Sequence, residues 1–263
     1  MLISQAGNSL SLMSNRKALE SGCFVIDQSD LALKRNGCLQ WAQVIGKDDA
    51  ARKLSLFYLL AEPGESPVIK LEQGEAVLYL QEGDCSISIS GREFLAAPAT
   101  GIHVRRGETF SFSNQGGIDA RWLLSICPRV EDLNFVDSPG SGFDNSYPDR
   151  TVSRSGREQH ASGDRSYQLL VGPSIGSEAV TQFIGSIPRS RAKEHFHLYE
   201  EAICILSGHG RMWTGEKSAP VAPGSMIFLP RKQPHSLECL DDKGMELMGV
   251  FYPAGSPAIN YET

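Results

Sequence analysis

The stretch His195-Phe-His-Leu-Tyr-Glu-Glu201, followed later by His235, decides how this chain folds and what it binds. In a β-strand the side chains of residues i and i+2 point to the same face, so His195 and His197 project together. Glu201 follows His197 by an even step and opens an apolar run, so its carboxylate can share that face. A neighbouring strand can bring His235 opposite the pair. Imidazole and carboxylate groups at this spacing predict one metal site with His195, His197, Glu201 and His235 as ligands.

Two alternatives accompany this hypothesis. A lone histidine in a strand is more often a structural or surface residue than a ligand, and a degenerate site can keep its residues without binding a metal tightly. Glu200 is the adjacent competitor of Glu201. It has the opposite parity from His197 in a continuous strand, so we expect Glu201 to be the ligand and Glu200 to be solvated.

The segment resembles the two motifs of the cupin superfamily, written His-x-His-x3-4-Glu-x6-Gly and Gly-x5-Pro-x-Gly-x2-His-x3-Asn. The residues that match them are His195, His197, Glu201 and Gly208 for the first motif, and Gly224, Pro230 and His235 for the second. Lys232 stands where the family often has Gly, and Cys239 stands where it often has Asn. Both departures lie outside the expected ligands.

An internal repeat extends the resemblance to the first half of the chain. At a shift of 126 residues, Glu75-Ala-Val-Leu-Tyr-Leu80 overlays the segment that begins at Glu201. On this overlay the three histidine positions hold Ile69, Leu71 and Phe110, and Glu75 alone survives. We therefore expect an N-terminal module without metal, which serves packing, dimerisation or access to the second module.

The fold class expected from this pattern is all-β. Many short strands separated by Gly, Pro, Asp and Asn favour an antiparallel sandwich or barrel, and the cupin resemblance implies two tandem jelly-roll (double-stranded β-helix) barrels. The expected organisation is an N-terminal extension over 1–40 with a short helix at 14–21, a degenerate cupin domain over 41–128, a linker over 129–165 and a metal-binding cupin domain over 166–263.

Composition restricts the class of protein. The 263 residues carry a net charge of −6 without a basic tract, which argues against a nucleic-acid partner. No apolar stretch is long enough for a membrane span, and the start lacks the pattern of a signal peptide. The six cysteines form no Cys-x-x-Cys pair, as is typical of free thiols in a reducing compartment. We expect a cytoplasmic protein that acts on a small molecule, and a homodimer because jelly-roll edge strands need covering.

The expected cofactor is one divalent metal ion per chain. Three nitrogens and one carboxylate without thiolate suit Fe or Mn first, with Zn, Ni and Co also open, and leave two positions of an octahedron free. The resemblance implies an oxidoreductase of the dioxygenase type. The alternatives are a non-redox isomerase, hydrolase or decarboxylase similar to ureidoglycine aminohydrolase, and a non-catalytic cupin that binds a small molecule.

Five further residues are candidates for contacts with the substrate. Arg189 and Arg191 precede the histidine pair and could hold a carboxylate by bidentate hydrogen bonds, with a solvated arginine as the alternative. Tyr199, Trp213 and Met226 are candidates for the pocket wall, and core packing is an equally open interpretation. No residue is identified as a general base.

Overall fold

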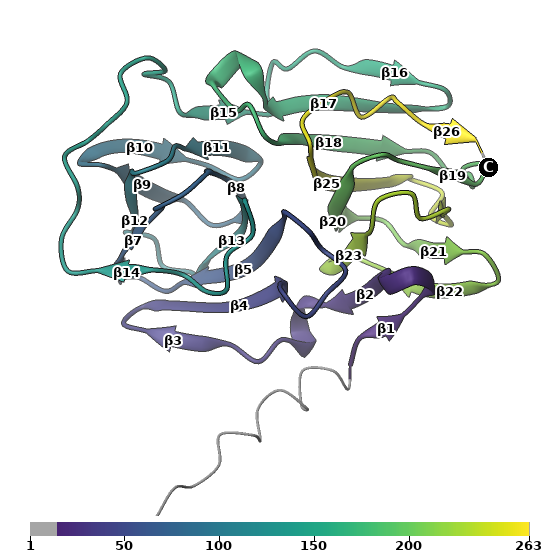
Figure 1. The fold of residues 1–263 in the computed structure, drawn as a ribbon, viewed down its shortest axis with the longest axis horizontal. Coiled ribbons are helices and arrows are strands. Elements are labelled where there is room, and N and C mark those ends of the chain that lie inside the picture. Colours follow the sequence, from purple (N-terminus) through teal and green to yellow (C-terminus); the bar gives the residue numbers. More distant parts are fainter. Residues whose placement is uncertain (1–14, 263) are drawn as a thin grey trace, which may run out of the picture.

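The computed structural model describes residues 15–262, which form two β-barrels side by side (Figure 1). The N-terminal barrel is built from two sheets. Strand order in the larger sheet is β15-β11-β8-β13-β5-β4-β3, and in the smaller one β10-β9-β12-β7-β14, with β6 also pairing with β12. The strands of this barrel are β3 (Lys34–Asn36), β4 (Leu39–Ile45), β5 (Ser55–Ala61), β6 (Gly64–Glu65), β7 (Val68–Lys70), β8 (Glu75–Glu82), β9 (Cys85–Ile89), β10 (Arg92–Ala96), β11 (Thr100–Val104), β12 (Thr109–Asn114), β13 (Ala120–Cys127), β14 (Phe135–Val136) and β15 (Thr151–Ser153).

The C-terminal barrel repeats this arrangement. Its large sheet has the order β1-β2-β23-β20-β25-β18-β17-β16, and the other face is formed by the sheet β22-β21-β24 and the pair β19-β26. The strands are β1 (Lys17–Ala18), β2 (Phe24–Asp27), β16 (His160–Ser162), β17 (Arg165–Val171), β18 (Thr181–Ile187), β19 (His195–Phe196), β20 (Glu200–Ser207), β21 (Gly210–Thr214), β22 (Lys217–Val221), β23 (Ser225–Leu229), β24 (Ser236–Cys239), β25 (Met245–Tyr252) and β26 (Tyr261–Glu262).

Three apolar clusters follow from strict alternation along the central strands. Along β8, Ala76, Leu78 and Leu80 fill the N-terminal barrel, while Val77 and Tyr79 point the other way. The outward residues meet their counterparts from the second module in a buried layer, here called the intermodule cluster. Its members include Leu54, Leu56, Tyr58, Val77, Tyr79, Val180, Ile184, Ala202, Cys204, Met226, Met248 and Val250. The two barrels are therefore joined by a core of their own.

Strand register corrects the expected overlay of the two halves. Glu75 pairs with Cys127, and Glu200 pairs with Tyr252 at the same place of the second barrel. Glu75 and Glu200 both point into the intermodule layer, whereas Glu201 points into its own barrel, where Ala76 is the equivalent residue. The expected match of Glu75 with Glu201 is thus wrong by one residue. A slip of one position reverses the face of every side chain.

The positions of the histidines in the first barrel are as expected. Ile69 pairs with Phe110, as His195 pairs with His235 in the second barrel. Leu71 occupies the equivalent of His197, because its carbonyl accepts the N–H of Gly107 as the carbonyl of His197 accepts that of Lys232. All three apolar residues are buried in the N-terminal core.

The segments outside the two expected domains are packed rather than free. Strand β2 pairs with β23 of the C-terminal barrel, and β3 and β4 join the N-terminal sheet, so the expected extension contributes to both modules. Within the expected linker, β14 pairs with β7 and β15 pairs with β11. The linker is anchored further by Arg150, which is fully buried and donates from Nη1 to Glu108 Oε2 at 2.6 Å.

The N-terminal helix is not formed where the sequence predicts it. Ser14 and the residues before it, including the start used to judge a signal peptide, lie outside the described residues. The remainder of 14–21 contains β1 and part of a 3-10 turn at Glu20–Gly22, because pairing with β2 overrides the local helix propensity. Within residues 15–262, no helix has the length and apolar character needed to cross a membrane.

Lys232 generates a prediction about stability. It has a positive φ of 62°, and the equivalent residue of the first barrel is Gly107 with φ of 84°. We expect Lys232→Gly to raise the free energy of unfolding by about 0.5–1 kcal/mol, which is the cost of the left-handed conformation less the added chain entropy of glycine. Urea denaturation of metal-free protein measures this change. Gly107→Lys, where an added Cβ meets no atom within 4 Å, is the matched control and should destabilise through backbone strain alone. An unchanged midpoint for Lys232→Gly contradicts the prediction.

Candidate metal centre

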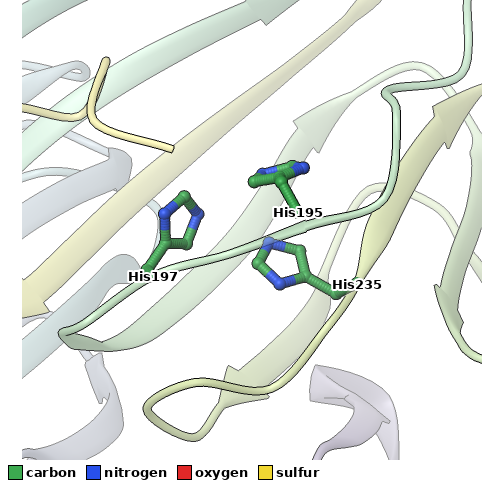
Figure 2. Close-up of side chains that lie close together, drawn as sticks. All are labelled: His195, His197 and His235. Atoms are coloured by element: carbon green, nitrogen blue, oxygen red, sulfur yellow. The ribbon is translucent and has the colours of Figure 1, made fainter. Parts of the chain in front are cut away.

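Backbone pairing brings two of the histidines together. The N–H of His195 donates to the carbonyl of His235 at 3.1 Å, and the N–H of His235 donates back to the carbonyl of His195 at 2.9 Å. In such a pair the side chains lie side by side, and the ring centroids are 4.5 Å apart. His197 lies two residues further along, and its ring centroid is 4.9 Å from that of His235. The three imidazoles converge on one point, with one nitrogen from each within 4.8 Å of the others (Figure 2).

Each imidazole is held in one tautomer by a backbone carbonyl. The Nδ1 atom of His195 lies 2.8 Å from the carbonyl of Lys193, that of His235 lies 2.9 Å from the carbonyl of Gln233, and that of His197 lies 3.2 Å from the carbonyl of Ile259. A carbonyl only accepts, so Nδ1 must carry the proton. The lone pair of each neutral ring is then on Nε2. This arrangement of an outer carbonyl behind each ring is typical of histidines that bind metals.

Electrostatics keeps these rings neutral. Burial lowers the pKa of His197 to about 4, with a further contribution from His195. Burial also lowers the pKa of His195 and lowers that of His235 well below its ordinary value. At neutral pH the three Nε2 atoms are therefore free of protons, which is the state that a metal ion requires.

Glu201 lies at the edge of the histidine cluster. Its Oε2 is 3.9 Å from Nε2 of His197, and the residue is 4% exposed. Burial raises the pKa of this carboxyl to about 8. Among residues 15–262, no hydrogen bond reaches the carboxyl group. A buried acid without a hydrogen-bond partner is costly, and a cation beside the three imidazoles would remove that cost. The residues present therefore fit a divalent metal ion.

A cavity of about 420 Å³ opens in front of the cluster. The three histidines and Glu201 form one side of it. The larger apolar residues of the remaining wall are Tyr167, Phe183, Ile187, Ile203, Met212, Leu237 and Leu247. Pro257, Asn260 and Glu262 of the C-terminal segment also line the cavity, near the pairing of β26 with β19. Polar and charged residues also line the cavity, among them Asp164, Arg165, Lys193 and Glu194, so its wall is mixed.

Arg165 was not anticipated as a site residue. Its Nη2 donates to the carbonyl of Leu237 at 2.7 Å, and burial lowers the pKa of the guanidinium. Asp164 is the acidic neighbour, 3.7 Å from Nε and more than half exposed. The sequence contains a signal for this position, because Arg165, Tyr167 and Leu169 alternate along β17 and share a face. The expected linker over 129–165 includes Arg165 and so separates it from this pattern.

Of the five candidates for substrate contacts, only Tyr199 lines this cavity. Its ring stacks on His197 at 4.4 Å between centroids and on Phe251 at 4.1 Å. Arg189 is exposed and pairs with Asp242.

The other three candidates also lie away from the cavity. Arg191 lies over the ring of Trp213, at 4.2 Å from its centroid, and the indole N–H donates to Glu238 at 2.9 Å. Met226 is fully buried in the intermodule cluster. Strand alternation explains the position of Met226, because its side chain faces the first module rather than the interior of its own barrel.

Glu200 is not solvated as expected, but 1% exposed. Glu200 points to the opposite face from Glu201, as the sequence predicts, yet the first module covers that face of β20. Sequence parity alone cannot show which faces a second barrel will cover.

Comparisons with known proteins agree with this architecture. The Cupin domain family matches residues 186–251, a range that contains all four expected ligands. A search of curated protein sequences finds no match to the chain.

Similar solved structures cover nearly the whole chain. A single-site mutant of oxalate decarboxylase from Bacillus subtilis superposes with a TM-score of 0.72 at 13% identity, covering 90% of this chain and 78% of that one. Oxalate decarboxylase from Lactobacillus farciminis, in a formate complex, gives 0.70 at 12% identity, covering 88% and 87%. A glyoxylate-induced protein from Pseudomonas aeruginosa gives 0.68 at 14% identity, covering 92% and 94%. The predicted tandem jelly-roll barrels are confirmed: the chain has the bicupin fold, and its C-terminal module is a cupin domain.

Proposed function

We propose that His195, His197, Glu201 and His235 hold one divalent metal ion, and that the C-terminal module is an enzyme site for a small carboxylate. The observation that carries this proposal is the convergence of three histidines whose Nδ1 atoms are all engaged by carbonyls. Fe or Mn suits these ligands best, with Zn, Ni and Co as alternatives. When bound, the ion supplies Lewis acidity, and iron would also supply electrons for dioxygen.

Arg165 and the apolar wall support the choice of substrate. A guanidinium in a partly apolar cavity attracts a carboxylate more strongly than one in water, because the local dielectric is lower. Phe183, Met212 and Leu247 give the cavity an apolar side, which favours an apolar body attached to that carboxylate. Tyr199 stacks on His197 and limits the rotation of its ring.

Two reaction classes use such a site. The resemblance to cupin dioxygenases favours oxidation of the bound carboxylate by dioxygen. Likeness in fold to oxalate decarboxylases favours decarboxylation as the second candidate.

Elemental analysis of anaerobically purified protein, with oxygen uptake and carbon dioxide release measured on a panel of carboxylates, tests the proposal. Iron with oxygen uptake that depends on substrate supports the dioxygenase. Manganese with carbon dioxide release and no oxygen uptake supports the decarboxylase. Metal binding without turnover of any carboxylate indicates a binding protein and refutes the enzyme.

Removing one imidazole tests the ligand set. We expect His197→Ala to abolish stoichiometric metal binding and to keep the fold, because the first barrel forms with Leu71 at the equivalent position. Titration with Mn²⁺ and circular dichroism measure the two properties. His209→Ala is the control, since His209 is exposed and pairs with Asp241. Retention of tight binding by His197→Ala would refute the proposed site.

Metal affinity should depend on pH through Glu201. Its pKa of about 8 means that the metal-free carboxyl is mostly protonated at pH 7, whereas His197 with a pKa of about 4 is already neutral. Binding must release the proton of Glu201, so affinity should rise about tenfold per pH unit up to pH 8 and level off above it. Calorimetry in buffers of different ionisation enthalpy counts the released proton. Glu201→Gln should release none. Equal proton release by wild type and this variant contradicts ligation by Glu201.

Arg165→Gln tests carboxylate recognition. We expect the metal-loaded variant to bind benzoate about 10- to 100-fold more weakly, because a charge-assisted hydrogen bond contributes about 1.5–3 kcal/mol. Calorimetric titration measures the affinity. Arg189→Gln removes an arginine that is exposed and outside the cavity, so it should leave the affinity unchanged. Equal affinities for all three proteins would exclude Arg165 from the binding site.

A further inference from the structure

Each barrel inserts one glutamate into a loop of the other. Glu200 begins β20 of the second barrel, and its carboxylate accepts three consecutive backbone N–H groups of the first barrel. Arg52 donates to Oε2 at 2.7 Å, and Lys53 and Leu54 both donate to Oε1 at 2.6 Å. Three adjacent N–H groups around one carboxylate form a compact anion site, which is a strong arrangement when it is buried.

Glu75 makes the reciprocal contact. Its carboxylate accepts the N–H groups of Glu178 at 3.3 Å, of Ala179, and of Val180 at 3.2 Å, and these residues lead into β18 of the second barrel. It also lies 2.7 Å from Nε2 of the buried His103. Burial opposes ionisation of Glu75, but the hydrogen bonds from His103 and the backbone prevail and lower its pKa. The two contacts are related by the internal repeat of the chain.

Only the contact of Glu200 adjoins the candidate metal site. Successive side chains of a strand point to opposite faces, so Glu200 points into the first module while Glu201 points toward His197. Residues 197–199 lie outside any strand, and the regular strand β20 begins at Glu200. The backbone of Glu201 is paired on both sides, with Leu229 of β23 and Phe251 of β25. Anchoring Glu200 therefore fixes the point at which the irregular segment that carries His197 enters β20.

We propose that Glu200 is a positioning residue through which the metal-free N-terminal module sets the metal affinity of the C-terminal module. This inference rests on the proposed metal site. Without the anchor, the segment that carries His197 would hold this ligand in place for only part of the time, and the apparent dissociation constant rises as the inverse of the fraction of molecules in the binding arrangement. The N-terminal barrel thus acts on the site although it contributes no ligand.

Glu200→Gln and Glu75→Gln form a matched pair of variants. In each variant the NH2 group of glutamine, which donates, replaces a carboxylate oxygen that accepted backbone N–H groups. The altered intermodule contact therefore weakens, and each variant loses thermal stability. Only Glu200→Gln should weaken Mn²⁺ binding, by about tenfold, which is the lower end of the effect of groups that orient ligands. Binding is measured from the electron paramagnetic resonance of free Mn²⁺, with His197→Ala as the variant without a site.

The outcomes separate this inference from the proposed function. Wild-type protein that binds no better than His197→Ala overturns both. Wild-type binding that is unchanged in Glu200→Gln, or weakened equally in both glutamine variants, overturns the positioning role alone. A loss confined to Glu200→Gln supports it.

Hydrogen exchange on the wild-type protein gives a test without variants. Coupling between two sites is reciprocal. If the contact of Glu200 with residues 52–54 strengthens metal binding, bound metal must in turn stabilise that contact against local opening. We expect Mn²⁺ to slow exchange at the amides of Arg52, Lys53 and Leu54 more than at those of residues 178–180, which report the general gain in stability. Equal slowing at the two loops would overturn the proposal.

Discussion

Strand β20 is buried on both faces, and this double burial is the constraint on which the rest of the structure depends. One face packs in the intermodule cluster through Ala202 and Cys204, and the other packs inside the C-terminal barrel through Ile203 and Ile205. Such a strand must satisfy every polar group it carries within the protein. Its first two residues point in opposite directions. Glu200 accepts hydrogen bonds from backbone N–H groups of the neighbouring barrel, whereas Glu201 faces the histidine cluster and receives no hydrogen bond from the described residues.

The first barrel shows that this architecture does not require metal ligands. Ile69, Leu71 and Phe110 replace the three histidines, and a cavity of about 320 Å³ with these residues in its wall remains at that place. Apolar alternation and strand pairing are enough to close the barrel, because the driving force lies in burial of both sheet faces. The scaffold therefore does not need the histidines and Glu201 of the second barrel, and their arrangement is to be explained by function.

Buried charges are distributed in a way that distinguishes structural from functional groups. Arg150 and Glu108 neutralise each other and hold the linker against the first barrel. Glu75 and Glu200 are surrounded by donors from the opposite module. Glu201 differs from these, since among the described residues the nearest titratable group to its carboxylate is the neutral ring of His197, at 3.9 Å. A fully satisfied carboxylate stabilises the fold, whereas one without donors identifies a place where a cation can bind.

The sequence by itself determined the all-β architecture, the presence of two modules and the histidine cluster. The repeat segment Glu75–Leu80 lies in β8 at Glu75–Glu82, and the pairing of His195 with His235 follows from two local motifs. These features are local, because alternation and turn residues are read within a few positions. Tertiary structure alone decided the register of the repeat, the burial of Glu200 and the position of Met226 at the module interface. Each of these depends on which faces meet across the two barrels, and contacts between residues more than a hundred positions apart leave no periodic signal in the chain.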